Sequence, residues 1–166
     1  MPNLLIANCI SFVSAIFTCL SCYFKDRKRI YYCLVGQCAA LAIANIFFES
    51  YAGIVTLILC TLRNFLLAID KYNKYTCIAL AAGMLVIGAA LNNMGGVGWL
   101  VIAANTIYTL GAYFARNEIT IKLNIIVDLV LWIIYEIIII DIPSLIADSV
   151  AIVIAVVTMV RSTRVH

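Results

Sequence analysis

The stretch Gly53 to Asp70, GIVTLILCTLRNFLLAID, decides how the rest of the chain is interpreted. It is apolar and long enough for a membrane-spanning helix, yet it holds one cation, Arg63, followed directly by Asn64. At a rise of about 1.5 Å per residue, Arg63 would lie about 15 Å into the hydrocarbon. An unpaired Arg at that depth costs on the order of 3 kcal/mol. The stretch therefore predicts a partner, a water-filled cavity or a function for Arg63.

The composition around this stretch predicts an all-α membrane protein. Of 166 residues, 66% are hydrophobic and 11% are charged, which is more apolar surface than a soluble domain of this size needs. The apolar runs are continuous, whereas a β-barrel would alternate apolar and polar residues. The net charge of +3 comes without a basic patch interleaved with aromatics, so we expect no nucleic-acid partner.

Cysteine and histidine usage argues against a metal site or a cofactor. The seven cysteines are scattered through apolar runs, where free thiols behave as small apolar side chains. The single histidine is His166, the last residue of the sequence. We therefore expect no metal, no cofactor and no histidine-based acid–base chemistry.

Seven apolar runs of roughly 17 to 21 residues follow one another, each long enough to cross a bilayer core. The first lacks the basic start of a secretory signal and is expected to be a retained span. The breaks between the runs are short, which makes consecutive helices antiparallel neighbours. The runs are Leu4–Phe24, Tyr31–Phe48, Gly53–Asp70, Tyr75–Leu91, Val97–Phe114, Lys122–Ile140 and Ser144–Val160.

The basic residues predict the orientation of these seven spans. They occur in or beside the first, third and fifth breaks and in the tail, whereas the other breaks have none. The positive-inside rule places them in the cytoplasm, so the N-terminus lies outside and the C-terminus inside. These residues are Lys25, Arg27, Lys28, Arg29, Lys71, Lys74, Arg116, Lys122, Arg161 and Arg164.

An internal repeat is visible at an offset of about ninety residues. Tyr23-Phe24 before the first basic break matches Tyr113-Phe114 before the fifth, and the break Glu49–Gly53 matches Ile139–Pro143. The pattern predicts a 3+1+3 parallel repeat with its pseudo-axis along the membrane normal. Its parts are residues 1–74 as a first three-helix unit, 75–94 as a linker helix and 95–166 as a second unit.

Polar residues inside the spans are the candidate site. Arg63 and Asp128 are predicted to pair across the two units, because each charge would offset the burial cost of the other. The purely structural alternative stays open, since buried ion pairs and Asn side chains also hold helices together. The candidate substrate-binding residues are Arg63, Asn64, Asp128, Asn105, Gln37, Asn45 and Trp132.

A second polar group is expected near the outer side. Glu136 and Asp148 could line a vestibule, share a proton and act as coupling carboxylates. They could equally be hydrated residues near the headgroups. Asp141 falls in the outer break and is expected to be hydrated.

Two segments carry a family resemblance: CYFKDRKRIYYCLVGQCAA and FFESYAGIVTLILCTLRNFLLAIDKYNK. Together they resemble the YgjV family of bacterial inner membrane proteins, with an aromatic pair before an Arg-rich break and a later span containing an Arg. Arg63 falls on that Arg, and Lys25, Arg27 and Arg29 fall on the charged break. The resemblance implies a multi-pass protein of the bacterial cytoplasmic membrane and brings no binding residues with it.

The 3+1+3 layout is also similar to that of the SWEET, PnuC and PQ-loop transporters, which move small solutes between two three-helix bundles. The chain departs from them because it contains no Pro-Gln pair. We therefore expect a small-solute transporter or facilitator that takes a polar or anionic solute. The alternative is a non-transporting scaffold that binds lipid or a partner. An enzyme is not expected, because no catalytic motif is present, and homo-oligomers through the small residues of the fourth run are left open.

Overall fold

The computed structural model describes residues 2–163, with side chains from residue 4 to residue 162. Within that range the chain forms seven α-helices and no strand, which confirms the all-α prediction. Arg164 and His166, used above, lie outside the described residues. The helices are α1 (Pro2–Tyr23), α2 (Arg27–Phe47), α3 (Tyr51–Ala68), α4 (Lys74–Ala90), α5 (Gly96–Phe114), α6 (Glu118–Ile139) and α7 (Ile142–Thr163).

Several helices begin before the apolar runs that predicted them, because polar caps start them. The Asp26 side chain accepts a hydrogen bond from the backbone N–H of Arg29, so the basic break forms the first turn of α2. Asn117 and Thr120 form a capping box at the start of α6, and Asn73 does the same for α4. The loops are consequently shorter than the polar breaks suggest.

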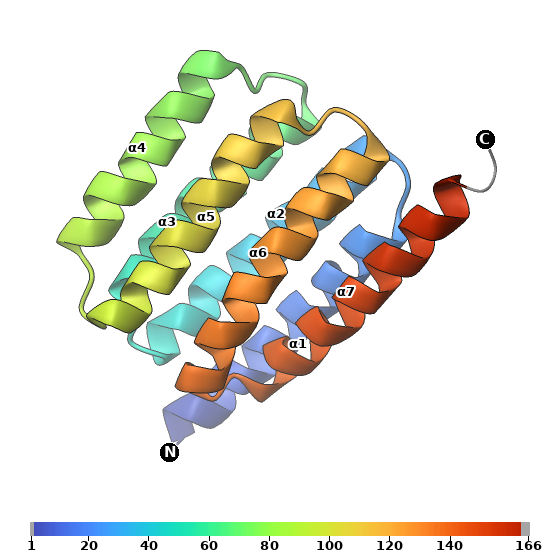
Figure 1. Ribbon diagram of the computed structural model, residues 1–166. Helices are drawn as coiled ribbons and strands as arrows, with labels where there is room; N and C mark the ends of the chain where they lie inside the picture. Colours follow the sequence, from blue (N-terminus) through green and yellow to red (C-terminus); the bar gives the residue numbers. More distant parts are fainter. Residues whose placement is uncertain (1, 164–166) are drawn as a thin grey trace.

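The helices lie in two rows (Figure 1). One row holds α1, α2 and α3 in order, and the other holds α7, α6 and α5. Helix α1 packs on α7 and α3 packs on α5, while α4 covers one edge by packing on both α3 and α5. The closely packed pairs do not include α2 and α6, the central helix of each row. These two helices are therefore farther apart, with side chains between them.

Five of the described helices are long and apolar enough to cross a membrane: α1, α2, α3, α5 and α7. Helix α4 is apolar but has 17 residues. Helix α6 has 22 residues but carries four Asp, Glu or Lys side chains, Glu118, Lys122, Asp128 and Glu136. Large apolar side chains point outward on both rows and on α4, among them Phe12, Ile58, Val86, Ile137 and Val153.

The core consists of two apolar clusters. One lies toward the basic connections and includes Tyr31, Leu34, Leu67, Tyr108, Ile125 and Leu129; we call it the Tyr31 cluster. The other lies toward the opposite end and includes Leu41, Leu57, Met84, Val101, Trp132 and Tyr135; we call it the Met84 cluster. The buried polar side chains of the bundle centre lie between them.

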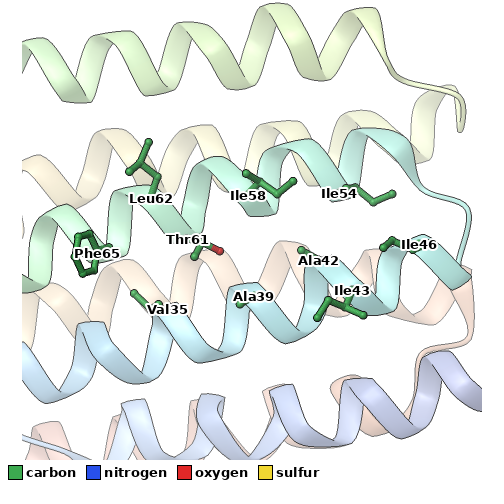
Figure 2. Close-up of a pocket in the computed structure, with 10 residues that line it drawn as sticks. All are labelled: Val35, Ala39, Ala42, Ile43, Ile46, Ile54, Ile58, Thr61, Leu62 and Phe65. Atoms are coloured by element: carbon green, nitrogen blue, oxygen red, sulfur yellow. The ribbon is translucent and has the colours of Figure 1, made fainter.

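The outer face of the first row carries an apolar groove between α2 and α3, with a volume of about 670 Å³ (Figure 2). Ile43 and Ile46 on α2 and Ile58 and Phe65 on α3 line it, and Thr61 is its one polar residue. A surface of this kind is suited to hydrocarbon rather than to water.

One buried cation fixes the end of the second row. Lys122 is fully buried, and its ammonium group donates to Glu118 and to the Thr158 hydroxyl, each at 2.7 Å. It therefore lies inside the bundle and joins α6 to α7, rather than at the edge of a loop as the sequence suggested.

Candidate functional site

Arg63 points into the bundle from α3 and is 3% exposed. Its Nε donates to Asn64 Oδ1 at 3.1 Å, and its Nη1 donates to Thr109 Oγ1 at 2.9 Å and to the Asn105 carbonyl at 3.4 Å. The guanidinium also lies over the ring of Tyr108, 4.1 Å from its centroid. Helix α5 of the other row thus supplies most of its partners.

The predicted ion pair between Arg63 and Asp128 is wrong: the ion pairs among the described residues do not include it. The physical reason is that neutral acceptors and an aromatic ring already surround the guanidinium. In a low-dielectric interior such partners stabilise a cation without an acid in contact. Arg63 and Asp128 nevertheless line the same cavity.

Asn64 and Asn105 belong to the Arg63 network. Asn105 donates to the Thr56 hydroxyl at 3.2 Å and accepts from the Cys60 thiol at 3.0 Å. The other amide, Asn64, donates to the Cys38 sulfur at 3.4 Å. The prediction included both amides but not Thr56, Cys60 and Thr109. Helical spacing could have indicated them, because Thr56, Cys60 and Arg63 share one face of α3 and Thr109 lies one turn after Asn105.

A narrow cavity lies between the two rows. The volume that the centre of a water molecule can occupy in it is about 20 Å³. That is room for about one water. Gln37 on α2 and Asp128 on α6 line it, together with Arg63 and Trp132. No hydrogen bond among the described residues uses the Gln37 side chain, and Asp128 Oδ1 is buried without a partner. The indole N–H of Trp132 is the donor beside the Asp128 carboxyl.

Asn45 lies outside this cavity. It is fully buried near the end of α2, where its amide accepts from the Tyr135 hydroxyl at 3.1 Å and donates to the Leu41 carbonyl at 2.9 Å. Gly53 on α3 approaches the same amide so closely that a Cβ there would collide with it. Asn45 therefore joins α2, α3 and α6, and the structure does not bring it together with Arg63.

Glu136 and Asp148 also lie outside the central cavity, between α6 and α7. They are 2% and 4% exposed, so neither is a hydrated headgroup residue. Their carboxyl groups are in hydrogen-bonding contact with each other. Glu136 Oε2 is buried and has no donor among the described residues.

Asp141, expected to be hydrated, is 1% exposed, which makes that expectation wrong. The turn between α6 and α7 is short and folds under α1, where the Ser11 hydroxyl donates to Asp141 Oδ2 at 2.7 Å. The Ser144 backbone N–H donates to Asp141 Oδ1 at 3.3 Å. Burial raises the pKa of the Asp141 carboxyl above its usual range, and these hydrogen bonds oppose that rise.

A helical bundle with an apolar exterior and buried polar groups at its centre is an integral membrane protein. The family model described as Imp-YgjV, bacterial inner membrane protein, matches residues 5–166. The chain belongs to this family, and the resemblance found in the sequence is confirmed. The protein is thus a multi-pass protein of the bacterial inner membrane, in contact with the lipid bilayer. No curated protein and no solved structure matches the chain.

Proposed function

We propose that the protein is a small-solute transporter or facilitator with no enzymatic activity, and that its solute site is the central cavity. The observation that carries this proposal is the pair Gln37 and Asp128. These polar side chains line one cavity from the central helices of the two rows. Asp128 Oδ1 is buried without a partner, and Gln37 is half-buried with no side-chain hydrogen bond to another described residue. Buried polar groups without partners are rare in folded proteins and point to a water or a ligand.

The proposal includes a parallel repeat of two three-helix units, and the helix boundaries support it. Helices α1 and α5 end at Tyr23 and Phe114, which are 91 residues apart. The same separation of 91 residues divides the starts of α2 and α6 and the starts of α3 and α7. The helix contacts agree with a two-fold relation, because α1 on α7 corresponds to α5 on α3. The units would be residues 1–74 and 95–166, with 75–94 as the linker.

The same separation relates Gln37 to Asp128, which line the cavity from the two central helices. A site on the pseudo-axis of a repeat receives equivalent positions from both halves. Here the equivalent positions carry a neutral amide and an acid. Arg63 has no such counterpart, because Ile154 stands 91 residues later. The site is thus chemically asymmetric, as the recognition of one small polar or anionic solute requires.

All seven helices would span the membrane, with the N-terminus outside and the C-terminus in the cytoplasm. The basic connections lie at one end of the bundle, where the positive-inside rule requires them. Although α6 carries four Asp, Glu or Lys side chains, Lys122 and Glu118 pair with each other at its cytoplasmic start. The others, Asp128 and Glu136, point inward, as ionisable residues in membrane helices do.

The two apolar clusters would act as gates in such a transporter. The Tyr31 cluster closes the cavity toward the basic connections, and the Met84 cluster closes it toward the other end. Rocking of one row against the other would loosen one cluster at a time and expose Gln37 and Asp128 to alternate sides. The structure would then correspond to an occluded state, since about 20 Å³ holds no solute.

A second candidate is the non-transporting scaffold. The observation in its favour is that Arg63 is already satisfied by Asn64, Asn105, Thr109 and Tyr108. A buried cation that is fully held can simply fix the helices in place. In this reading Gln37 and Asp128 would bind one structural water, and the lipid-facing groove between α2 and α3 would take a lipid chain or a partner helix.

The small residues of α4 give limited support to a homo-oligomer. Ala81 is buried within the chain, and a Cβ at Gly88 would press on Ile102 of α5 and Thr56 of α3. Ala79 and Ala82 are exposed and remain available to a second copy. We therefore propose that most of this face serves packing inside the chain.

A thermal-shift screen of the purified protein against polar and anionic metabolites tests the proposed site. A metabolite that raises the unfolding temperature of the parent should fail to do so in Gln37→Leu and in Asp128→Asn. Arg29→Ala is the control, because it removes an exposed cation whose side chain is 71% exposed. A shift that survives in both cavity variants would refute the site, and a screen without any shift would favour the scaffold.

A further inference from the structure

Glu136 and Asp148 present a chemical problem that the solute site does not explain. Both carboxyls are more than nine-tenths buried, they contact each other, and Glu136 Oε2 has no donor. Among the described residues, no ion pair involves either of them. Two acceptor groups in contact repel each other unless a proton lies between them.

No positively charged group near the pair, in the described part of the chain, offsets its negative charge, so a bound proton must do so. Turning both groups into carboxylates would place two negative charges side by side in a low dielectric, which costs many kcal/mol. Helix α5 has no charged residue, and the buried ammonium of Lys122 is bonded to Glu118. The titratable groups that face the pair are neutral or acidic: Cys19 and Cys22 on α1, Asp128 and Tyr135 on α6, and Asp141 in the turn.

Asp141 differs from the pair because the Ser11 hydroxyl and the Ser144 N–H donate to both of its oxygens. Its charged form is therefore stabilised, whereas Glu136 and Asp148 cannot both be charged. When Asp141 is ionised, its negative charge at the outer end of α6 attracts protons toward the pair. The same turn places the pair close to the face that the proposed orientation puts outside the cell.

We propose that Glu136 and Asp148 form a proton-binding site that always shares one proton and exchanges a second one with the outer solution. On loading, hydronium transfers a proton to the free carboxyl oxygen of the pair, an O–H bond forms there, and water leaves. On release, the same O–H bond breaks and water takes the proton. Use of this proton as the coupling ion rests on the proposed transport function, whereas the proton site itself does not.

Infrared difference spectra of the purified protein between about pH 5 and about pH 9 test the site. The carbonyl stretch of a protonated carboxylic acid should persist at the alkaline end, from the shared proton, and grow on acidification, from the second. In Glu136→Gln the component from the shared proton should be lost, and the growth on acidification should fall to what the remaining Asp148 carboxyl contributes. Asp148→Asn carries the same test from the other helix if Glu136→Gln fails to fold.

Asp26→Asn is the matched control, because it removes an exposed carboxyl while Asn remains an equally good helix cap. Its spectra should equal those of the parent. An unchanged carboxylic acid band in both pair variants would overturn the proposal, and so would a band that responds to sodium instead of pH. Either result leaves the metabolite screen unaffected, and a failed screen leaves the proton site standing.

Discussion

The molecule contains two buried polar regions that differ in the balance of hydrogen-bond donors and acceptors. Around Arg63, one cation meets neutral acceptors and a ring, and each hydrogen bond recorded for it has a partner on α3 or α5. Around Glu136, two carboxyl groups meet, and Glu136 Oε2 has no donor among the described residues. The presence of a charge in a hydrophobic helix therefore does not show whether it serves stability or chemistry; the balance of donors and acceptors around it does.

The largest effect should come from removing the satisfied cation. Arg63→Leu removes three hydrogen bonds and leaves Asn64 Oδ1 and Thr109 Oγ1 without the donor that they accept from, whereas the Asn105 carbonyl keeps the Thr109 hydroxyl. The cost is about 0.6 kcal/mol for each lost bond and more for each orphaned acceptor. We expect the free energy of unfolding to fall by about 2 kcal/mol. Unfolding by SDS in mixed micelles, followed by circular dichroism, measures it.

Arg29→Leu controls for the loss of one positive charge, since the Arg29 side chain is 71% exposed. We expect a change within about 0.5 kcal/mol. If Arg63→Leu is as stable as this control, the hydrogen bonds around Arg63 do not hold the bundle, and the contrast between the two regions disappears.

The opposite sign is expected in the acidic region. Glu136→Gln replaces one carboxyl of the pair by a neutral amide, which can donate to Asp148 at any pH without a shared proton. We expect the free energy of unfolding to rise by about 1 kcal/mol at neutral pH. The same SDS titration measures it, with Asn45→Asp as a comparison that adds an acid to a satisfied amide and should destabilise. A loss of stability in Glu136→Gln would mean that the carboxyl has partners that this structure lacks.

The number and type of the helices could be predicted from the apolar runs, but their starts could not. Asp26 and Asn117 lie outside the apolar runs, but their side chains cap α2 and α6 and so start these helices within polar sequence. Lys122 shows the consequence: it was assigned to a loop edge but is fully buried one turn inside a helix. Capping motifs in the printed sequence would have corrected this.

The residues around the central cavity could be predicted in part. Gln37, Arg63, Asp128, Asn105 and Trp132 do line one cavity. The partners of Arg63 could not be predicted, because the sequence suggests an acidic partner for a buried cation. In the structure a hydroxyl and a carbonyl on α5 accept its hydrogen bonds instead. The burial of Asp141 could not be predicted either, because it depends on Ser11, which is distant in sequence and adjacent only in the fold.

The smallest change in the free energy of unfolding is expected at the helix caps, where equivalent positions of the two halves can be compared. Asp26 and Asn117 stand 91 residues apart and cap α2 and α6, but only Asn117 takes part in a full capping box with Thr120. Loss of a cap costs about 0.5 to 2 kcal/mol, at the low end where a single exposed bond is lost. We therefore expect Asn117→Ala to lower the free energy of unfolding by about 1 kcal/mol and Asp26→Ala by about 0.5 kcal/mol. Asn117→Asp, which keeps an oxygen acceptor, is the control and should change little. Equal losses at the two caps would show that the second bond of the box adds nothing, and a larger loss at Asp26 would reverse the ranking of the halves at this end of the bundle.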